Sequence, residues 1–275
     1  MKRLLNRRPG RVSRALLGML PFVLLLLIYM VTSDARLAEN PDDKLLPSFS
    51  SIGAAIDRMA FEPSKRSGDY LLWADTGASL QRLALGVGIS AVIALVFGVL
   101  LGIIPYINAG FSPFVSAISM IPPMAILPIL FIVFGLGEVS KVVLVVIGIT
   151  PFITRDLQQR VREIPSEQII KAQTLGGSTW QLIIRVVLPQ VLPRLIDAVR
   201  LSLGAAWLFL IAAEAIAATE GLGYRIFLVR RYLAMDVILP YVIWITLLAF
   251  LTDLTLRYIS RIAFPWFQKL TADST

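Results

Sequence analysis

The sequence contains no cysteine and no histidine among its 275 residues, and only 16% of its residues are charged. Without these two residue types the chain forms no disulfide bonds, carries no thiolate chemistry and lacks the usual ligands of zinc, copper and haem sites. A soluble domain carries roughly 25% charged residues. The shortage of charge, together with a hydrophobic fraction of 57%, excludes disorder and predicts an integral membrane protein.

The charge that is present is mostly basic, with a net charge of +8. On so apolar a chain, lysine and arginine are better interpreted as a signal of membrane topology than as a nucleic-acid-binding surface. We therefore expect a lipid bilayer around the chain and no nucleic-acid partner.

Long uncharged runs predict about six transmembrane helices, since one helical crossing needs about 20 residues. Residues 15–33 form the first crossing. The 55 uncharged residues 83–137 hold two crossings, joined by a turn at Pro105, Asn108, Gly110 and Pro113. The last three crossings are predicted at residues 139–154, 201–219 and 237–252.

The first crossing has a second interpretation. A basic segment followed by an apolar run also describes a signal peptide. The run is long for a signal peptide and no clear cleavage site follows it. A retained helix is the favoured interpretation, and a cleaved signal peptide is the alternative.

The distribution of lysine and arginine predicts that both termini are cytoplasmic. The basic segment 1–14 precedes the first crossing, and residues 266–275 form a tail after the last one. Residues 34–77 are expected to form a periplasmic loop, because the stretch 34–75 has eight acidic residues against five basic ones. One loop, 220–236, is predicted to be exterior yet carries Arg225, Arg230 and Arg231.

Small residues recur at every fourth position in the second crossing, at Gly86, Ser90, Ala94, Gly98 and Gly102. On a helix they form one smooth stripe, which allows another helix backbone to approach closely. The stripe predicts helix-on-helix packing.

Two features inside the predicted crossings are candidates for a translocation pathway. Pro122 and Pro123, followed by Met124, break the third crossing, and broken helices are typical of transport pathways. Glu214 is an ionisable residue within the fifth crossing, which makes it a functional candidate. A packed kink and a hydrogen-bonded structural carboxylate are the alternatives. Asp253 and Arg257 are expected to form a local pair four residues apart.

The segment between the fourth and fifth crossings predicts a bent pair of short helices. Pro165 begins the first of them, and Gly176-Gly177 ends it. Ser178 and Gln181 match a capping box that opens the second helix, which Pro189 is expected to close. An exposed apolar face on such a pair suits either a protein partner or the membrane surface.

This segment resembles the signature loop of ATP-binding-cassette (ABC) importer permeases, in which Glu-Ala-Ala, three residues, Gly, nine residues and Ile-x-Leu-Pro follow one another. Ala172 and Gly176 match the second alanine and the glycine, Val186 takes the isoleucine position, and Leu188-Pro189 match the end. Ile170 and Lys171 replace the glutamate and first alanine. The resemblance to the nitrate, taurine and alkanesulfonate branch continues through residues 75–265, including Pro122-Pro123, 134–138, 213–219 and 221–223.

The resemblance implies an all-α protein of the type I importer permease fold, in the bacterial inner membrane. It implies a five-helix core at 78–265 and a coupling loop at about 160–188 that docks a cytoplasmic ATPase. The coupling residues are then Ile170, Lys171, Ala172, Gly176, Leu188 and Pro189. A second permease copy in a homodimer and a periplasmic binding protein are the other implied partners.

The chain is not expected to be an enzyme, because without histidine or cysteine, and with one carboxylate inside a crossing, it offers no nucleophile–base pair or metal cluster. It also has no phosphate-binding Gly-x-x-x-x-Gly-Lys-Ser/Thr motif, so we expect no cofactor in this chain. ATP and magnesium are then used by the partner ATPase. The implied solute is small and polar, such as nitrate or a sulfonate, and a small nitrogen compound related to urea is the second candidate. A stand-alone secondary transporter or channel is the alternative function.

Overall fold

The computed structural model describes residues 10–40, 43–65 and 68–267, and in this part of the chain the regular elements are helices. The predicted all-α class is confirmed. Most of the predicted basic segment 1–14, and most of the tail 266–275, lies outside the described residues.

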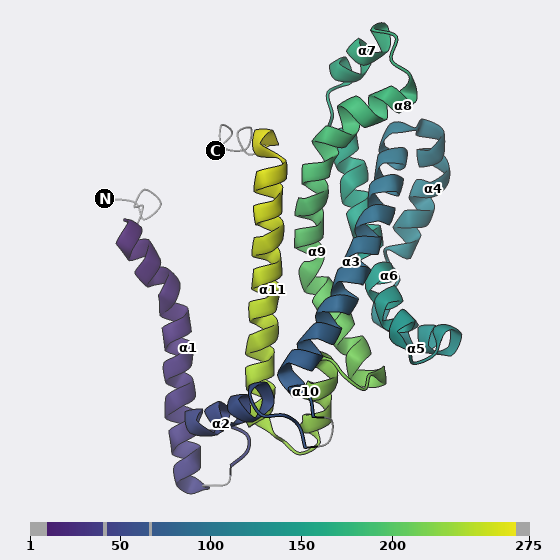
Figure 1. Cartoon of the computed structure of the whole chain (residues 1–275). Helices are drawn as coiled ribbons and strands as arrows, with labels where there is room; N and C mark the ends of the chain where they lie inside the picture. The colour runs from purple at the N-terminus through teal and green to yellow at the C-terminus, as the bar shows by residue number, and fades with distance from the viewer. Residues whose placement is uncertain (1–9, 41–42, 66–67, 268–275) are drawn as a thin grey trace.

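Long helices and short connecting helices alternate along the chain (Figure 1). The long ones are α1 (Arg11–Glu39), α3 (Leu71–Ile103), α6 (Glu138–Arg162), α9 (Leu188–Ala217) and α11 (Met235–Ala263). The short ones are α2 (Phe49–Ala60), α4 (Pro105–Ile118), α5 (Pro123–Phe134), α7 (Ser166–Thr174), α8 (Thr179–Leu182), a π-helical turn η2 (Ile183–Val187) and α10 (Leu222–Arg230).

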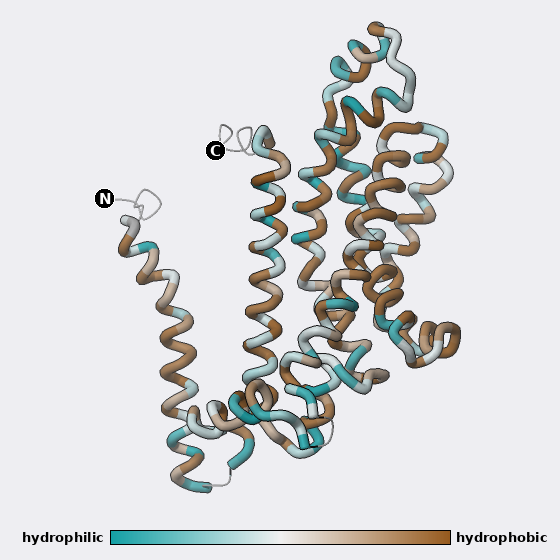
Figure 2. Tube along the Cα trace, viewed as in Figure 1, coloured by the Kyte–Doolittle hydropathy of each residue, from teal (hydrophilic) through white to brown (hydrophobic). Residues whose placement is uncertain are grey.

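The long helices pass back and forth between two ends of the molecule. α1 and α9 run away from the end that carries α7, whereas α3, α6 and α11 run back toward it (Figure 1). The start of α1 and the end of α11 therefore lie on the side of α7. Hydrophobic residues follow the long helices, and hydrophilic residues gather near α7 and near α10 (Figure 2).

Four helices of the described chain are long and apolar enough to cross a membrane, at Val12–Glu39, Leu71–Ile103, Thr179–Ala217 and Met235–Ala263. A fifth crossing results if α4 and α5, which meet at 93°, form one broken span. The fourth predicted crossing, at 139–154, corresponds to α6, which is not among these helices because its charged ends confine its uncharged stretch to residues 142–154. By length and composition the structure thus gives four or five crossings where the sequence predicts six.

The N-terminal helix is longer than the predicted crossing 15–33, and the predicted loop 34–77 contains α2 and the start of α3. Tyr29 and Ser33 tie α1 to the segment before α2: their hydroxyls donate to the carbonyls of Pro47 at 2.7 Å and Leu46 at 2.9 Å. Asp43 caps the same turn. The backbone N–H of Leu45 and the Arg36 guanidinium hold the pKa of the Asp43 carboxyl below its ordinary value.

The stripe of small residues on α3 packs against α6, as predicted. A Cβ added at Gly86 would lie 2.8 Å from Cγ1 of Val145, and one added at Gly98 would lie 2.7 Å from Cβ of Leu157. At Gly102 an added Cβ would overlap the Val161 side chain. Because these separations are too short for real contacts, the close approach of the two helices requires glycine at these positions.

The predicted turn between the second and third crossings is wrong: Asn108, Gly110 and Pro113 lie inside α4. The chain reverses at Ile104 alone, and Pro105 occupies the first turn of α4, where a missing N–H is harmless. Asn108 then donates its side-chain amide to the free carbonyl of Leu101 at 2.6 Å. The predicted break at Pro122 is confirmed, since α4 and α5 are separated there by the 93° bend.

Pro189 does not end the second helix of the predicted coupling loop, so the prediction that this helix closes at Pro189 is wrong. One helix continues from Thr179 to Ala217. A π-helical turn precedes the proline, and the N–H of Leu188 there reaches back to the carbonyl of Ile183. Because the π-helical turn has already replaced the usual hydrogen-bond pattern, the backbone N–H that Pro189 lacks does not interrupt the helix. The Gln190 side chain also donates to the carbonyl of Val186 at 2.9 Å.

Candidate functional site: an exposed elbow and a buried ion network

Residues 165–182, which we call the elbow, form a bent helix pair that projects beyond the long helices (Figure 1). α7 follows Pro165, as predicted, and ends in a Schellman motif. The N–H of Gly177 donates to the carbonyl of Ala172 at 3.0 Å, and the N–H of Gly176 donates to that of Gln173 at 2.9 Å. Gly176 has a φ of 79°, a conformation that favours glycine.

A capping box opens the second arm of the elbow. The Ser178 hydroxyl accepts the backbone N–H of Gln181, and the Gln181 side chain accepts the backbone N–H of Ser178 at 2.9 Å. Both predicted signals, the glycine stop and the capping box, are confirmed. They explain why the chain bends here instead of continuing as one helix.

The apolar residues of the elbow divide between two faces. Ile169 and Ala172 pack against the core of the bundle. Ile170, Leu175 and Trp180 face outward, with exposed fractions of 54%, 88% and 66%. Such exposure on a polar end of the molecule is typical of a surface that binds a partner.

The six residues predicted to couple to the ATPase fall into two groups. Ile170, Lys171, Ala172 and Gly176 come together on α7 and its C-terminal turn. Leu188 and Pro189 lie at the start of α9, beyond the π-helical turn, and are half-buried. The structure therefore joins the first four in one surface and separates the last two from it.

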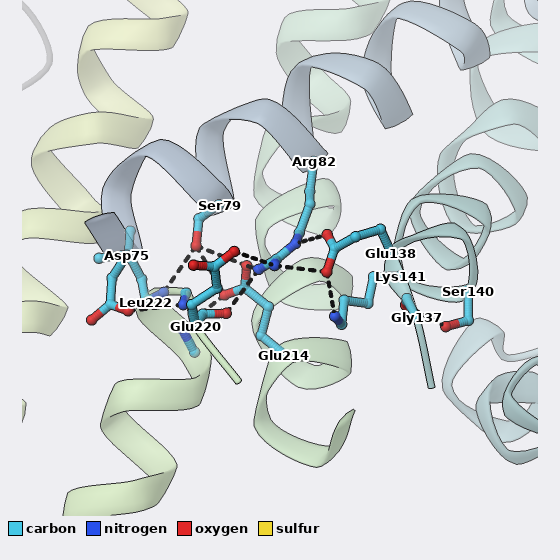
Figure 3. Close-up of polar contacts among 12 residues, drawn as sticks. Asp75, Ser79, Arg82, Gly137, Glu138, Ser140, Lys141, Glu214, Glu220 and Leu222 are labelled. Atoms are coloured by element: carbon cyan, nitrogen blue, oxygen red, sulfur yellow. Dashed lines mark hydrogen bonds and ion pairs between the residues drawn. The ribbon is translucent and has the colours of Figure 1, made fainter. Parts of the chain in front are cut away.

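Glu214 lies at the centre of a second candidate site, which we call the buried ion network. Its members are Asp75, Ser79, Arg82, Glu138, Lys141, Glu214 and Arg225, of which Glu138 alone is exposed. Figure 3 shows these residues except Arg225. The Glu214 side chain is fully buried. The Ser79 hydroxyl donates to its carboxylate at 2.8 Å, Arg82 Nη1 at 2.8 Å and the N–H of Gly223 at 2.9 Å. Arg82 thus neutralises the carboxylate, and each of the carboxylate oxygens accepts at least one hydrogen bond.

Arg82 connects Glu214 to the start of α6. Its guanidinium forms a bidentate ion pair with Glu138: Nε donates to Oε2, and Nη2 donates to Oε1 at 2.9 Å. Lys141 also donates to Glu138, at 2.7 Å. The Arg82 side chain is only 4% exposed, and Nη1 also donates to the carbonyl of Glu220 at 2.9 Å. One guanidinium thus joins α3, α6, α9 and the turn before α10.

Asp75, one turn before Ser79 on α3, is the second buried carboxylate of the network. Arg225 Nε donates to it at 2.8 Å, the N–H of Gly221 at 2.9 Å and the Tyr241 hydroxyl at 3.1 Å. The loop 220–236 is predicted to be exterior although it carries three arginines. The pairing accounts for one of them, since Arg225 neutralises the buried carboxylate of Asp75.

The turn 221–223 approaches these carboxylates closely because it contains two glycines. Gly221 has a φ of 123°, and an added Cβ would lie 2.6 Å from Cδ of Glu214. A Cβ at Gly223 would lie 2.9 Å from Cα of Ile211. Between them, the N–H of Leu222 donates to the Ser79 hydroxyl at 2.9 Å. Gly221 and Gly223, which are part of the family resemblance, are therefore required here because a larger side chain would collide with its neighbours.

The predicted pathway residues occupy two different environments. Pro122 and Met124 lie at the bend between α4 and α5, where Met124 is 39% exposed. Glu214 is enclosed by α3 and α10, and this geometry favours the structural alternative for its role. Among the described residues no group of three or more acidic side chains is placed to hold a metal ion.

Sequence reasoning missed the polar face of α3 that pairs with Glu214 and with Arg225. Asp75, Ser79 and Arg82 stand at positions i, i+4 and i+7 of one helix, so they share a face. A polar face at the start of a strongly apolar helix is a signal for buried polar contacts. The sequence alone gives no indication that the partners are Arg225 and Glu214, which lie more than a hundred residues away.

Comparison with known proteins identifies relatives of this chain. The family model described as binding-protein-dependent transport system inner membrane component matches residues 92–263. The taurine transport system permease protein TauC of Escherichia coli (strain K12) is 35% identical over 198 residues, which are 72% of each chain. The bicarbonate transport system permease protein CmpB of Synechococcus elongatus is 31% identical over 193 residues, covering 70% of this chain and 69% of that protein.

A solved structure also matches. An inward-facing structure of the MetNI methionine ABC transporter has a TM-score of 0.63 and 25% sequence identity, and it covers 72% of this chain and 98% of that chain. The family match includes the elbow and Glu214, but it begins after the α3 residues of the ion network.

Proposed function

This chain belongs to the family of binding-protein-dependent transport system inner membrane components, and on that premise we propose how it works. It is a multi-pass permease subunit of an ABC transporter in the inner membrane. Permeases of this kind act with an ATPase and a substrate-binding protein. In our proposal the elbow docks the ATPase, which alone uses ATP and magnesium.

The exposed apolar surface of the elbow carries this proposal. Ile170, Leu175 and Trp180 point away from the bundle on a rigid frame made by the Schellman motif and the capping box. A short helix with outward apolar side chains suits a groove on a partner protein. The elbow, the start of α1 and the end of α11 lie toward the same end, which we assign to the cytoplasm (Figure 1).

We assign the remaining partners from the same family. Two copies of the chain form a homodimer around the translocation pathway, and a periplasmic protein delivers the solute to the opposite end. Pro122, Pro123 and Met124, at the bend between α4 and α5, line that pathway.

The solute in this proposal is a small molecule with an oxyanion group. The relatives named above are permeases for taurine and for bicarbonate. A sulfonate and a bicarbonate share one negative charge spread over oxygen atoms on a single centre. A permease that serves such solutes needs hydroxyl, amide or guanidinium donors along its pathway.

Copurification tests the docking proposal. The Leu175→Glu variant places a charge on the exposed apolar tip, and we expect it to reduce recovery of the ATPase at least about tenfold, as for loss of an apolar anchor. Leu45→Glu makes the same change on an exposed residue at the opposite end of the molecule and is expected to leave recovery unchanged.

Two results would contradict the proposal. One is full recovery of the ATPase with Leu175→Glu and with Gly176→Val together. The other is uptake by the isolated chain in liposomes, driven by an ion gradient without ATP, which would support a stand-alone secondary transporter.

A further inference from the structure

A polar pocket of about 480 Å³ lies between α4 and α6, apart from the elbow and the ion network. On α4, Ser112 and Ser116 line it, and Ser119 follows on the same face. On α6, Arg155 and Arg162 line it, also seven residues apart and on one face. Two polar stripes thus face each other.

Hydrogen bonds between the helices build the floor of this pocket. Arg155 Nη1 donates to the Ser119 hydroxyl at 2.9 Å, and the Gln158 side chain donates to the Ser112 hydroxyl at 3.3 Å. Gln158 is only 7% exposed. These two bonds hold Arg155 and Gln158 toward α4, and the Arg155 and Arg162 side chains remain accessible from solvent.

The pocket has an excess of positive charge. Its lining contains one carboxylate, Asp156, whose ion-pair partner is Arg160 at 3.7 Å. Within the described residues, Arg155 and Arg162 form no ion pair. Two guanidinium groups and two hydroxyls remain as donors, which is the donor set that an oxyanion requires.

The position of the pocket links it to transport. Ser119 and Arg155 stand beside the bend that precedes Pro122, and Arg162 lies about 10 Å further toward the elbow, at 1.5 Å per helical residue. The serines belong to the uncharged run 83–137. Inside a bilayer, polar groups that lack a protein partner need water or a ligand to satisfy them.

We propose that Ser112, Ser116, Arg155 and Arg162 bind the oxyanion group of the transported solute on its way from the bend to the cytoplasm. This inference rests on the proposed function and names a subsite within it. A sulfonate or bicarbonate group accepts hydrogen bonds from Arg155 and the nearby serine hydroxyls first and from Arg162 further along, so its charge is neutralised before release.

Thiol labelling of the full-length chain tests this inference without the ATPase. The sequence has no cysteine, so a Ser116→Cys variant carries one reactive thiol. In phosphatidylcholine nanodiscs, the sulfonatoethyl methanethiosulfonate reagent should react faster than the trimethylammonioethyl reagent. Adding Arg155→Gln and Arg162→Gln should lower this rate ratio at least about tenfold, the size expected when two nearby charges are lost.

The matched control is Thr174→Cys on the exposed elbow, where the two arginine changes should leave the ratio unaltered. Methanesulfonate, taurine or bicarbonate should slow the labelling of Ser116→Cys, but only when both arginines are present. Ser112→Cys repeats the measurement in case the first variant folds poorly, and size-exclusion chromatography reports folding.

Three outcomes would overturn the inference: an unchanged ratio, lack of protection by all three solutes, or a charge preference that requires phosphatidylglycerol in the nanodisc. The last result would assign the pocket to a lipid headgroup. Because no ATPase takes part, failure here is distinct from failure of ATPase copurification, which tests the proposed function itself.

Discussion

Glu214 illustrates how a single buried carboxylate holds several helices. Its donors come from α3 and from the first turn of α10, and Arg82 extends the contacts to α6. A buried ion pair contributes little net stability when compared with apolar packing, but removal of one partner is costly because the other charge stays buried. The buried ion network therefore contributes more to the specific packing of α3, α6, α9 and α10 against one another than to net stability.

Glu214→Gln is expected to destabilise the protein by about 3 kcal/mol, within the range for breaking a buried pair. The amide keeps the size of the side chain but turns an N–H₂ group toward Arg82 or the N–H of Gly223, both of which are donors. Thermal unfolding in detergent measures the effect.

The control is Glu220→Gln, which removes a 58% exposed carboxylate 3.8 Å from the same arginine. Its expected cost is below about 1 kcal/mol, as for surface pairs. Equal shifts in the two variants would show that burial does not decide the strength of these contacts.

Gly221→Ala separates backbone strain from steric contact. Gly221 and Gly135 both have positive φ, but an added Cβ meets Glu214 only at Gly221, whereas at Gly135 it meets nothing within 4 Å. Gly135 lies in an extended positive-φ region that only glycine readily adopts, so we expect Gly135→Ala to cost about 1–3 kcal/mol and Gly221→Ala at least twice as much. Comparable melting temperatures for the two variants would refute the close approach of the turn.

At the scale of single elements, local signals predicted some features correctly and missed others. The stop at Gly176, the capping box at Ser178 and the small-residue stripe on α3 each depend on neighbours within a few residues or on one helix face. Such features are encoded locally, and the structure confirms them.

The sequence-based predictions fail where the lipid environment or a residue far away in the sequence determines the local structure. Gly110 and Pro113 are turn signals in water, but a helix is the conformation that satisfies its own backbone in lipid, and α4 includes both. Pro189 is accommodated in a continuous helix by the π-helical turn before it, and no local sequence motif predicts such a turn. The pairing of Asp75 with Arg225 spans 150 residues and depends on the complete fold.

The packing of α3 on α6 yields a prediction for two glycines of the same helix. Gly98→Ala places a Cβ 2.7 Å from Cβ of Leu157, whereas at Gly88 an added Cβ meets nothing within 4 Å. Overpacking should cost about 1–3 kcal/mol at Gly98. Gly88→Ala should be neutral or slightly stabilising, since alanine favours helices. Thermal unfolding compares them, and a neutral Gly98→Ala would contradict the tight helix contact.

At the scale of the whole molecule, the two ends are predicted to face opposite sides of the membrane. Because the native chain lacks cysteine, Thr174→Cys on the elbow and Lys44→Cys before α2 each report one end. In sealed inside-out vesicles, a membrane-impermeant maleimide should label Thr174→Cys at least about tenfold faster. Preferential labelling of Lys44→Cys would invert the topology and remove the elbow from the cytoplasm.

The π-helical turn has a consequence for how motion passes through the protein. Thr179–Ala217 is one unbroken helix of 39 residues, about 58 Å long at 1.5 Å per residue. Trp180 stands at one end and Glu214 near the other. If the ATPase docks at the first end, as we propose, a displacement there passes along this helix to Glu214, and the ion pair between Glu214 and Arg82 must then either hold or break.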